Sequence, residues 1–269
     1  MQETGNNLSY TNNISIRVHA DGFSFYCYTP HSVPAIKKET FNLSSEKSAA
    51  ESLNEAITQS SMLKQEDKAV YGLISSPSIQ IPLEYFKKEE ASALFHLTYT
   101  HQQEKKIYYN ILPHLEVVKI FDIPKETEEV LCSHFPTIRF YHIHTMIMEK
   151  TAFQKATDRQ QLYIYLHDKE VFLLKYNSQS LHYSNTFPAD ATDNIIYYIL
   201  SVWKLLNMDA ETDECVFLGE HQLQNGAISA LSPYLRNIRT LTNGELYKRS
   251  GAGNLPDIPL DVLSLLLNT

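Results

Sequence analysis

The fold is decided by the stretch ISIRVHADGFSFYCY, which covers residues 14–28. Apolar and polar residues alternate from Ile14 to His19, which is the period of a strand. Asp21-Gly22 predicts a tight turn, and the residues after it form the returning strand of a hairpin. A third strand is expected near residues 40–43.

The rest of the first half predicts helices alternating with buried strands. Ser44 or Ser45 is expected to cap a helix with one apolar stripe, and residues 70–74 read as a buried central strand. Further elements are expected in the following order: a strand at 79–81, a helix at 84–99, strands at 107–112 and 115–121, a helix at 125–134, a strand at 137–145 and a helix at 146–153.

The second half repeats this order. Three strands are predicted in close succession, followed by a helix that Asp190 and Asp193 open and by a buried strand that ends at Gly219. The strands cover 162–167, 171–176, 181–187 and 215–218. A helix kinked at Pro233, a short strand and a final helix that begins after Pro259 complete the chain. We therefore predict two domains, residues 1–154 and 155–269.

Composition, charge and cysteine spacing exclude several classes of protein. The chain has 269 residues, 43% of them hydrophobic, and a net charge of −8. Basic residues form only short pairs with acidic residues close by, which argues against nucleic-acid binding. Three widely spaced cysteines argue against disulfides or a thiolate zinc site. The sequence shows no signal peptide and no apolar run of membrane-spanning length, so we expect a cytoplasmic protein without membrane insertion.

Three antiparallel strands extended by crossover-connected parallel strands, with helices on both faces of the sheet, form the ribonuclease H-like unit. Two such units in one α/β chain resemble the actin-like ATPase superfamily. The chain is most similar to its compact cytoplasmic members from bacterial pilus and secretion systems, and to a bacterial family of unknown function with an actin-like fold. The strands at 107–121 and the weak element near Ile238 depart from the pattern.

The resemblance implies that two hairpin turns and an adenosine loop would hold Mg-ATP in the cleft between the units. The implied residues are Asp21, Gly22, Ser24, Asp168 and Gly219. Glycines in such turns let backbone N–H groups reach phosphate oxygens. Here the Asp-x-Gly spacing is lost, bulky Phe23 follows Gly22, and Glu170 adds a negative charge to the second turn. Glu220 replaces a glycine of the adenosine loop. These departures oppose nucleotide binding.

Other candidate functional sites have weaker support in the sequence. The first strand of each half lacks the carboxylates that a ribonuclease H nuclease needs for its metals. His142 and His144 lie two apart on a predicted strand and would share a face, which leaves a metal-dependent hydrolase as a third hypothesis. The chain has 17 tyrosines and 12 phenylalanines; tyrosine suits protein interfaces as well as cores.

The leading hypothesis is a non-enzymatic actin-like scaffold or protein-interaction module with degenerate nucleotide-binding loops. It would act by binding a protein partner or by self-association, and we expect it to need no cofactor and no metal. The alternative is a divergent actin-like ATPase or sugar-kinase relative that binds Mg-ATP. In that case Asp21 and Asp168 would lie near Mg²⁺ and Gly219 near the base.

Overall fold

The computed structural model describes residues 13–29, 35–64, 69–100, 104–154, 159–177, 180–247 and 258–267. The chain forms two compact units, one of residues 1–146 with 262–269 and the other of residues 147–261. The division falls inside two helices, α4 (Ile143–Ala152) and α8 (Leu260–Leu267). Within the described residues, no helix is long and apolar enough to cross a membrane.

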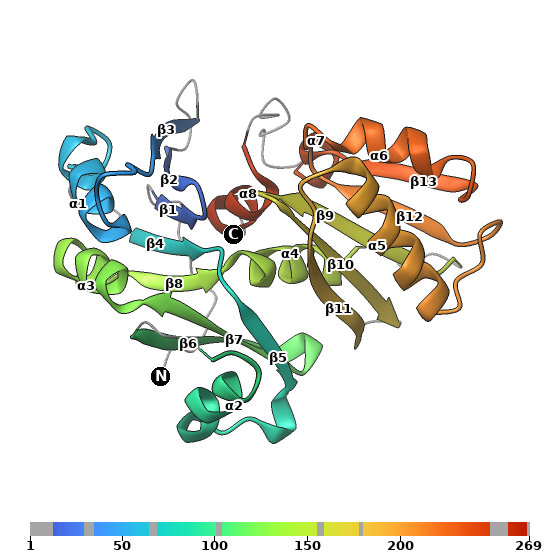
Figure 1. Cartoon of the computed structure of the whole chain (residues 1–269), viewed down its shortest axis with the longest axis horizontal. Helices are drawn as coiled ribbons and strands as arrows, with labels where there is room; N and C mark the ends of the chain where they lie inside the picture. The colour runs from blue at the N-terminus through green and yellow to red at the C-terminus, as the bar shows by residue number, and fades with distance from the viewer. Residues whose placement is uncertain are drawn as a thin grey trace. The chain divides into compact units, whose positions relative to one another are not determined.

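The first unit contains a five-stranded sheet in the order β3-β2-β1-β4-β8 (Figure 1). β1, β2 and β3 pair antiparallel, whereas β4 and β8 extend the sheet in parallel with β1. The strands span Asn13–His19, Gly22–Tyr28, Ile36–Asn42, Ala69–Ile74 and Arg139–His142. Three antiparallel strands extended by parallel strands are the arrangement that the sequence predicts.

Helices α1 (Ala49–Gln59) and α3 (Lys125–His134) pack together beside this sheet (Figure 1). The alternating apolar residues of β1 and β2 lie in one core cluster with Leu53 of α1 and Leu131 of α3. The apolar side of the period-two pattern of residues 14–28 therefore faces these helices. The other side of β1 and β2 is buried as well, with Ser15 and Tyr26 almost fully covered.

A second, three-stranded sheet in the first unit has the order β5-β7-β6, with antiparallel pairing throughout. β7 serves two cores, because Phe121 packs in the cluster of the main sheet and Ile120 packs against α2. The elements of this region are β5 (Ser78–Pro82), α2 (Ala91–Thr98), β6 (Lys105–Leu112), β7 (Val117–Pro124) and 3₁₀ turns at Leu83–Tyr85, Lys88–Glu90 and Pro113–Leu115.

The second unit repeats the main sheet of the first, in the order β11-β10-β9-β12-β13. β9, β10 and β11 are antiparallel, and β12 and β13 extend the sheet in parallel with β9. The strands span Gln161–His167, Glu170–Asn177, Ser180–Pro188, Glu214–Leu218 and Asn237–Leu241. The predicted duplication of an α/β unit is thus confirmed.

Helices lie on both faces of this second sheet. α5 (Thr192–Leu205) and α6 (Gln224–Leu231) share a core with one face. On the other face, the hydroxyls of Tyr176 in β10 and Thr151 in α4 lie 2.8 Å apart. A short helix, α7 (Asn243–Leu246), follows β13, and the ring of Tyr247 beyond it receives the Lys150 ammonium at 3.7 Å.

Several local predictions were wrong. The first hairpin turn is Ala20-Asp21, and Gly22 already belongs to β2. The helix expected at 84–99 begins only at Ala91, after two 3₁₀ turns. The helix expected to kink at Pro233 ends at Leu231, because proline cannot continue the hydrogen-bond ladder. The third strand begins earlier than expected, at Ile36.

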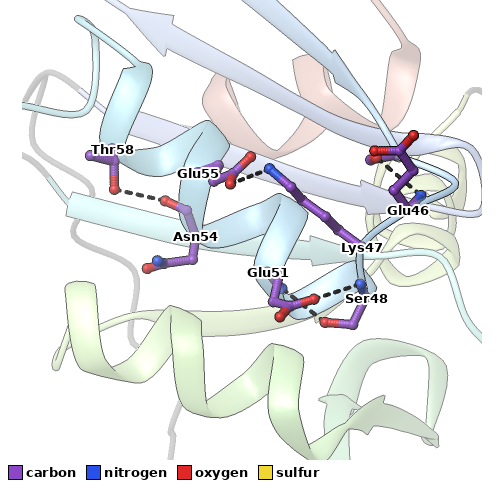
Figure 2. Close-up of polar contacts among 8 residues, drawn as sticks. Glu46, Lys47, Ser48, Glu51, Asn54, Glu55 and Thr58 are labelled. Atoms are coloured by element: carbon purple, nitrogen blue, oxygen red, sulfur yellow. Dashed lines mark hydrogen bonds and ion pairs between the residues drawn. The ribbon is translucent and has the colours of Figure 1, made fainter.

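The cap of α1 is another correction. Ser48, and not Ser44 or Ser45, caps the helix (Figure 2). Its hydroxyl accepts a hydrogen bond from the Glu51 N–H, and the Glu51 carboxylate accepts one from the Ser48 N–H at 2.8 Å. This reciprocal capping box satisfies two N–H groups that would otherwise lack a partner at the helix start.

Candidate functional site

The first hairpin, formed by β1, β2 and the turn between them, holds three of the predicted site residues. Asp21 is exposed at the second position of the two-residue turn, and Ser24 lies buried on β2. The Ser24 hydroxyl is 3.4 Å from Nε2 of His19, the last residue of β1. The Phe23 side chain points away from these groups, since it packs in the apolar core of the first unit.

Glycine is needed at position 22 for a structural reason that does not involve a ligand. Its φ is +152°, and a Cβ built there would lie 2.2 Å from the carbonyl oxygen of Phe41 on β3. Only glycine combines that backbone conformation with such close approach of the neighbouring strand. The glycine is therefore required for β2 to pair with β3.

The second hairpin turn is Asp168-Lys169, between β9 and β10. Asp168 has φ +48°, in the left-handed region that aspartate tolerates better than most residues. The buried His167 ring lies between two carboxylates, with Nδ1 3.5 Å from Asp168 and Nε2 3.8 Å from Glu170. The ring also stacks on Tyr165, with the ring centroids 5.3 Å apart.

The strand registers make the two turns directly comparable. His19 pairs with Gly22 across the first turn, and His167 pairs with Glu170 across the second. The aspartates are therefore not equivalent, because Asp21 is the second residue of its turn and Asp168 the first. Gly22, directly after the first turn, corresponds to Glu170, directly after the second, so a carboxylate stands where the first hairpin has a glycine.

Gly219 follows β12 with φ +68°, and its N–H donates to the carbonyl of Leu241. Two residues later, His221 forms a hydrogen bond with the backbone of Asp168 and accepts one on Nδ1 from the Leu223 N–H. Burial, followed by the nearby His167, lowers the pKa of His221. The fold thus joins the Gly219 loop to the second turn through the His221 imidazole.

Sequence reasoning missed both His167 and His221. His167 ends its strand as His19 does, so this repeat was a signal that could have been found. His221 had no such signal, because only the parallel pairing of β12 with β9 brings it near Asp168. Asp21, Gly22 and Ser24 belong to the first unit, and Asp168 and Gly219 to the second.

These groups fit Mg-ATP poorly. A triphosphate needs convergent backbone N–H groups, which glycine-rich turns provide. The glycine of the first turn is packed against β3, and the second turn has Lys169 but surrounds it with the carboxylates of Asp168 and Glu170.

The proposed histidine pair also differs from expectation. His142 ends β8, but His144 lies in α4, so the two residues do not share a strand face. The Nδ1 atom of His142 accepts from the His144 N–H at 3.1 Å, and its Nε2 lies 2.9 Å from the carbonyl of Ser76. Both ring nitrogens are therefore engaged by backbone groups, which fits a structural histidine better than a metal ligand.

An open groove of about 630 Å³ runs along α1 and α3. Three carboxylates line it, from Glu51, Glu126 and Glu129, together with the apolar side chains of Ala50 and Val130. Figure 2 shows that Glu51 is already bound in the capping box of α1. The groove therefore has an acidic lining of which one member has a structural role.

Comparison with known proteins supports the fold and gives the family. A Bacteroides thetaiotaomicron protein with an actin-like ATPase fold and unknown function is 26% identical, with 96% of each chain covered and a TM-score of 0.79. A chain of the PilM–PilN type IV pilus biogenesis complex is 10% identical, with 97% of this chain and 99% of that one covered and a TM-score of 0.59.

The predicted resemblance to the actin-like superfamily is confirmed by these structures. A search of curated protein sequences finds no match. The sequence profile of a family described as protein of unknown function (DUF3822) matches residues 2–238, which is most of the chain. The chain therefore belongs to the DUF3822 family.

Proposed function

We propose that this chain is a cytoplasmic, non-enzymatic bacterial scaffold of the actin-like fold that acts by binding another protein or itself. The observation that carries the proposal is the chemistry of its two hairpin turns. The duplicated sheets keep the turns in place, but the turns present a glycine packed against β3 and a carboxylate at the matching position.

Electrostatics support this proposal at the second turn. Asp168 and Glu170 place two carboxylates there, and His221 forms a hydrogen bond with the backbone of Asp168, with Lys169 as the cationic residue of the turn. A phosphate placed beside two carboxylates would be repelled, since like charges at short range disfavour binding. Nothing at this turn favours a polyanion strongly enough to replace the missing glycines.

The solved PilM–PilN complex supports the binding role by analogy. Its matching chain shares the fold of this one and occurs in a complex with a second protein. Fold does not determine function, so this likeness supports only the general idea that such a scaffold can serve as a docking protein.

Isothermal titration calorimetry with Mg-ATP tests the proposal. We expect no binding at micromolar affinity, for the wild type or for Asp21→Ala. Micromolar binding that Asp21→Ala abolishes would overturn the proposal in favour of the alternative, a divergent actin-like ATPase or sugar-kinase relative. Size-exclusion chromatography with light scattering on the same samples shows whether the chain binds itself.

A further inference from the structure

The β3 strand forms one edge of the five-stranded sheet of the first unit. The backbone bonds at its two ends fix which residues face inward, because Ala35 accepts from the Thr29 N–H and Leu43 donates to Asp21. Antiparallel pairing alternates inward and outward residues. The outward residues are therefore Ile36, Lys38, Thr40 and Asn42.

The N–H and C=O groups of these four outward residues point away from β2 along the seven residues of β3. No backbone hydrogen bond reaches them from any other part of the chain that the structure describes. Such a row of unpaired groups is a template for pairing with another strand. Strand addition at a sheet edge is a common way of binding extended peptides.

The charge on this edge indicates which strand it would accept. Lys37 and Lys38 are both exposed, and Lys38 also lies over the Tyr26 ring with 5.8 Å to the centroid. The one acidic residue of β3, Glu39, is engaged by hydroxyl donors, since Ser60 and Ser61 both donate to its carboxylate. The edge is thus basic in a chain of net charge −8.

We propose that the β3 edge binds an extended acidic segment of a partner protein by adding it as a sixth strand. This inference rests on the proposed role as an interaction scaffold and names the surface that performs it. Backbone hydrogen bonds to the four outward residues would hold the segment, and its carboxylates would pair with Lys37 and Lys38 across the strands.

Lysines on an edge strand also oppose unwanted pairing, so their effect is selective. They repel basic strands and disfavour registers of a second copy that place Lys38 opposite itself, while they attract acidic strands. The equivalent edge strand of the second unit, β11, carries no lysine, arginine or carboxylate. The basic edge is therefore a property of β3 and not of the repeated fold.

The test uses two fluorescein-labelled peptides of about ten residues. Valine and threonine are interspersed with adjacent pairs of glutamates in one peptide and of lysines in the other, so that each pair places one charge on each face of the added strand. Fluorescence anisotropy with nucleotide-free protein at low salt measures their affinities. We expect the acidic peptide to bind wild type at least tenfold more tightly than the basic one. The double variant Lys37→Glu/Lys38→Glu should reverse this preference.

The backbone contribution is tested at Thr40. Thr40→Pro removes an outward N–H that the β2 pairing does not use, as proline on an edge strand allows, and should weaken acidic-peptide binding at least tenfold. Thr40→Val keeps the N–H and should bind as wild type does. Circular dichroism establishes that each variant is folded.

Equal affinity for both peptides, or wild-type affinity in folded Thr40→Pro, would overturn the inference. A dimer that Thr40→Pro converts to a monomer would overturn it in favour of a second copy as the occupant. Micromolar Mg-ATP binding would instead overturn the scaffold proposal. Because the peptide assay contains no nucleotide, the two failures are distinguishable.

Discussion

Gly22 is the residue on which the pairing of β2 with β3 depends. Alanine there would place Cβ 2.2 Å from the Phe41 carbonyl oxygen and keep a backbone φ of +152° that side chains disfavour. We expect Gly22→Ala to lower the free energy of unfolding by about 1–3 kcal/mol. Urea denaturation followed by circular dichroism measures this. Asp21→Ala, at the exposed turn beside it, is the control and should change stability little.

Asn110 connects the two sheets of the first unit. Its amide nitrogen donates to the Phe140 carbonyl at 3.0 Å, and its oxygen accepts from the His142 N–H at 2.9 Å and from the Thr145 hydroxyl at 3.0 Å. The Asn110 side chain thus forms hydrogen bonds with backbone groups at the outer edge of β8, as a neighbouring strand would.

Asn110→Ala would leave these three buried groups without their partner. We expect a loss of at least about 3 kcal/mol in unfolding free energy, because each of the three unsatisfied buried groups costs on the order of 1–3 kcal/mol. Thr145→Val removes only one of the bonds and should cost less. Equal losses for the two variants in the same urea assay would contradict this account of Asn110.

At the scale of elements, the start of α1 gives a sharp comparison between two serines. Ser48→Ala removes the cap and should cost about 1 kcal/mol. Ser44→Ala, four residues earlier, lies outside the helix and should cost less than half as much. If Ser44→Ala proved the more damaging in thermal unfolding, the capping assignment would be wrong.

The same cap predicts a pH dependence. Hydrogen bonds from the Ser48 backbone and side chain hold the pKa of Glu51 below its ordinary value of 4.5. A carboxyl whose pKa is lower when folded stabilises the protein fully above the unfolded value, and the effect is lost as the pH falls through the folded pKa. The stability difference between wild type and Glu51→Gln should therefore be present at pH 7 and shrink below pH 4.5.

Elements with a strong local signal could be predicted from the sequence. Alternation placed β1 and β2, and α3 has the predicted bounds because Pro124 and Pro136 flank it. The cap of α1 was missed although its Ser48-x-x-Glu51 spacing was visible. The helix expected at 84–99 begins only at Ala91, because the seven residues 84–90 are all charged or aromatic and give no apolar stripe.

The candidate site was less predictable for a physical reason. Asp168 could be placed on a turn because the turn is local in sequence. The bond that joins His221 to that turn depends on a parallel pairing between strands about 50 residues apart, which no local pattern encodes. Likewise, the requirement for Gly22 arises from β3 and not from the turn itself.

At the scale of the whole molecule, the two units share a strand order but each has its own core. The main core of the first unit and the core around α5 and α6 have no residue in common. The chain's single tryptophan, Trp203, lies buried in the second of these cores. Its fluorescence therefore reports the packing of the second unit.

Separate cores lead us to expect separable unfolding, as is common for chains with more than one domain. Gly22→Ala should shift the urea transition seen by far-ultraviolet circular dichroism while leaving the midpoint of Trp203 fluorescence unchanged. Leu231→Ala, which empties a buried position in the same core as Trp203, should lower the fluorescence midpoint by an amount corresponding to about 2–5 kcal/mol. If Gly22→Ala moved both signals equally, the two units would unfold as one cooperative structure, and the expectation of separable unfolding would be wrong.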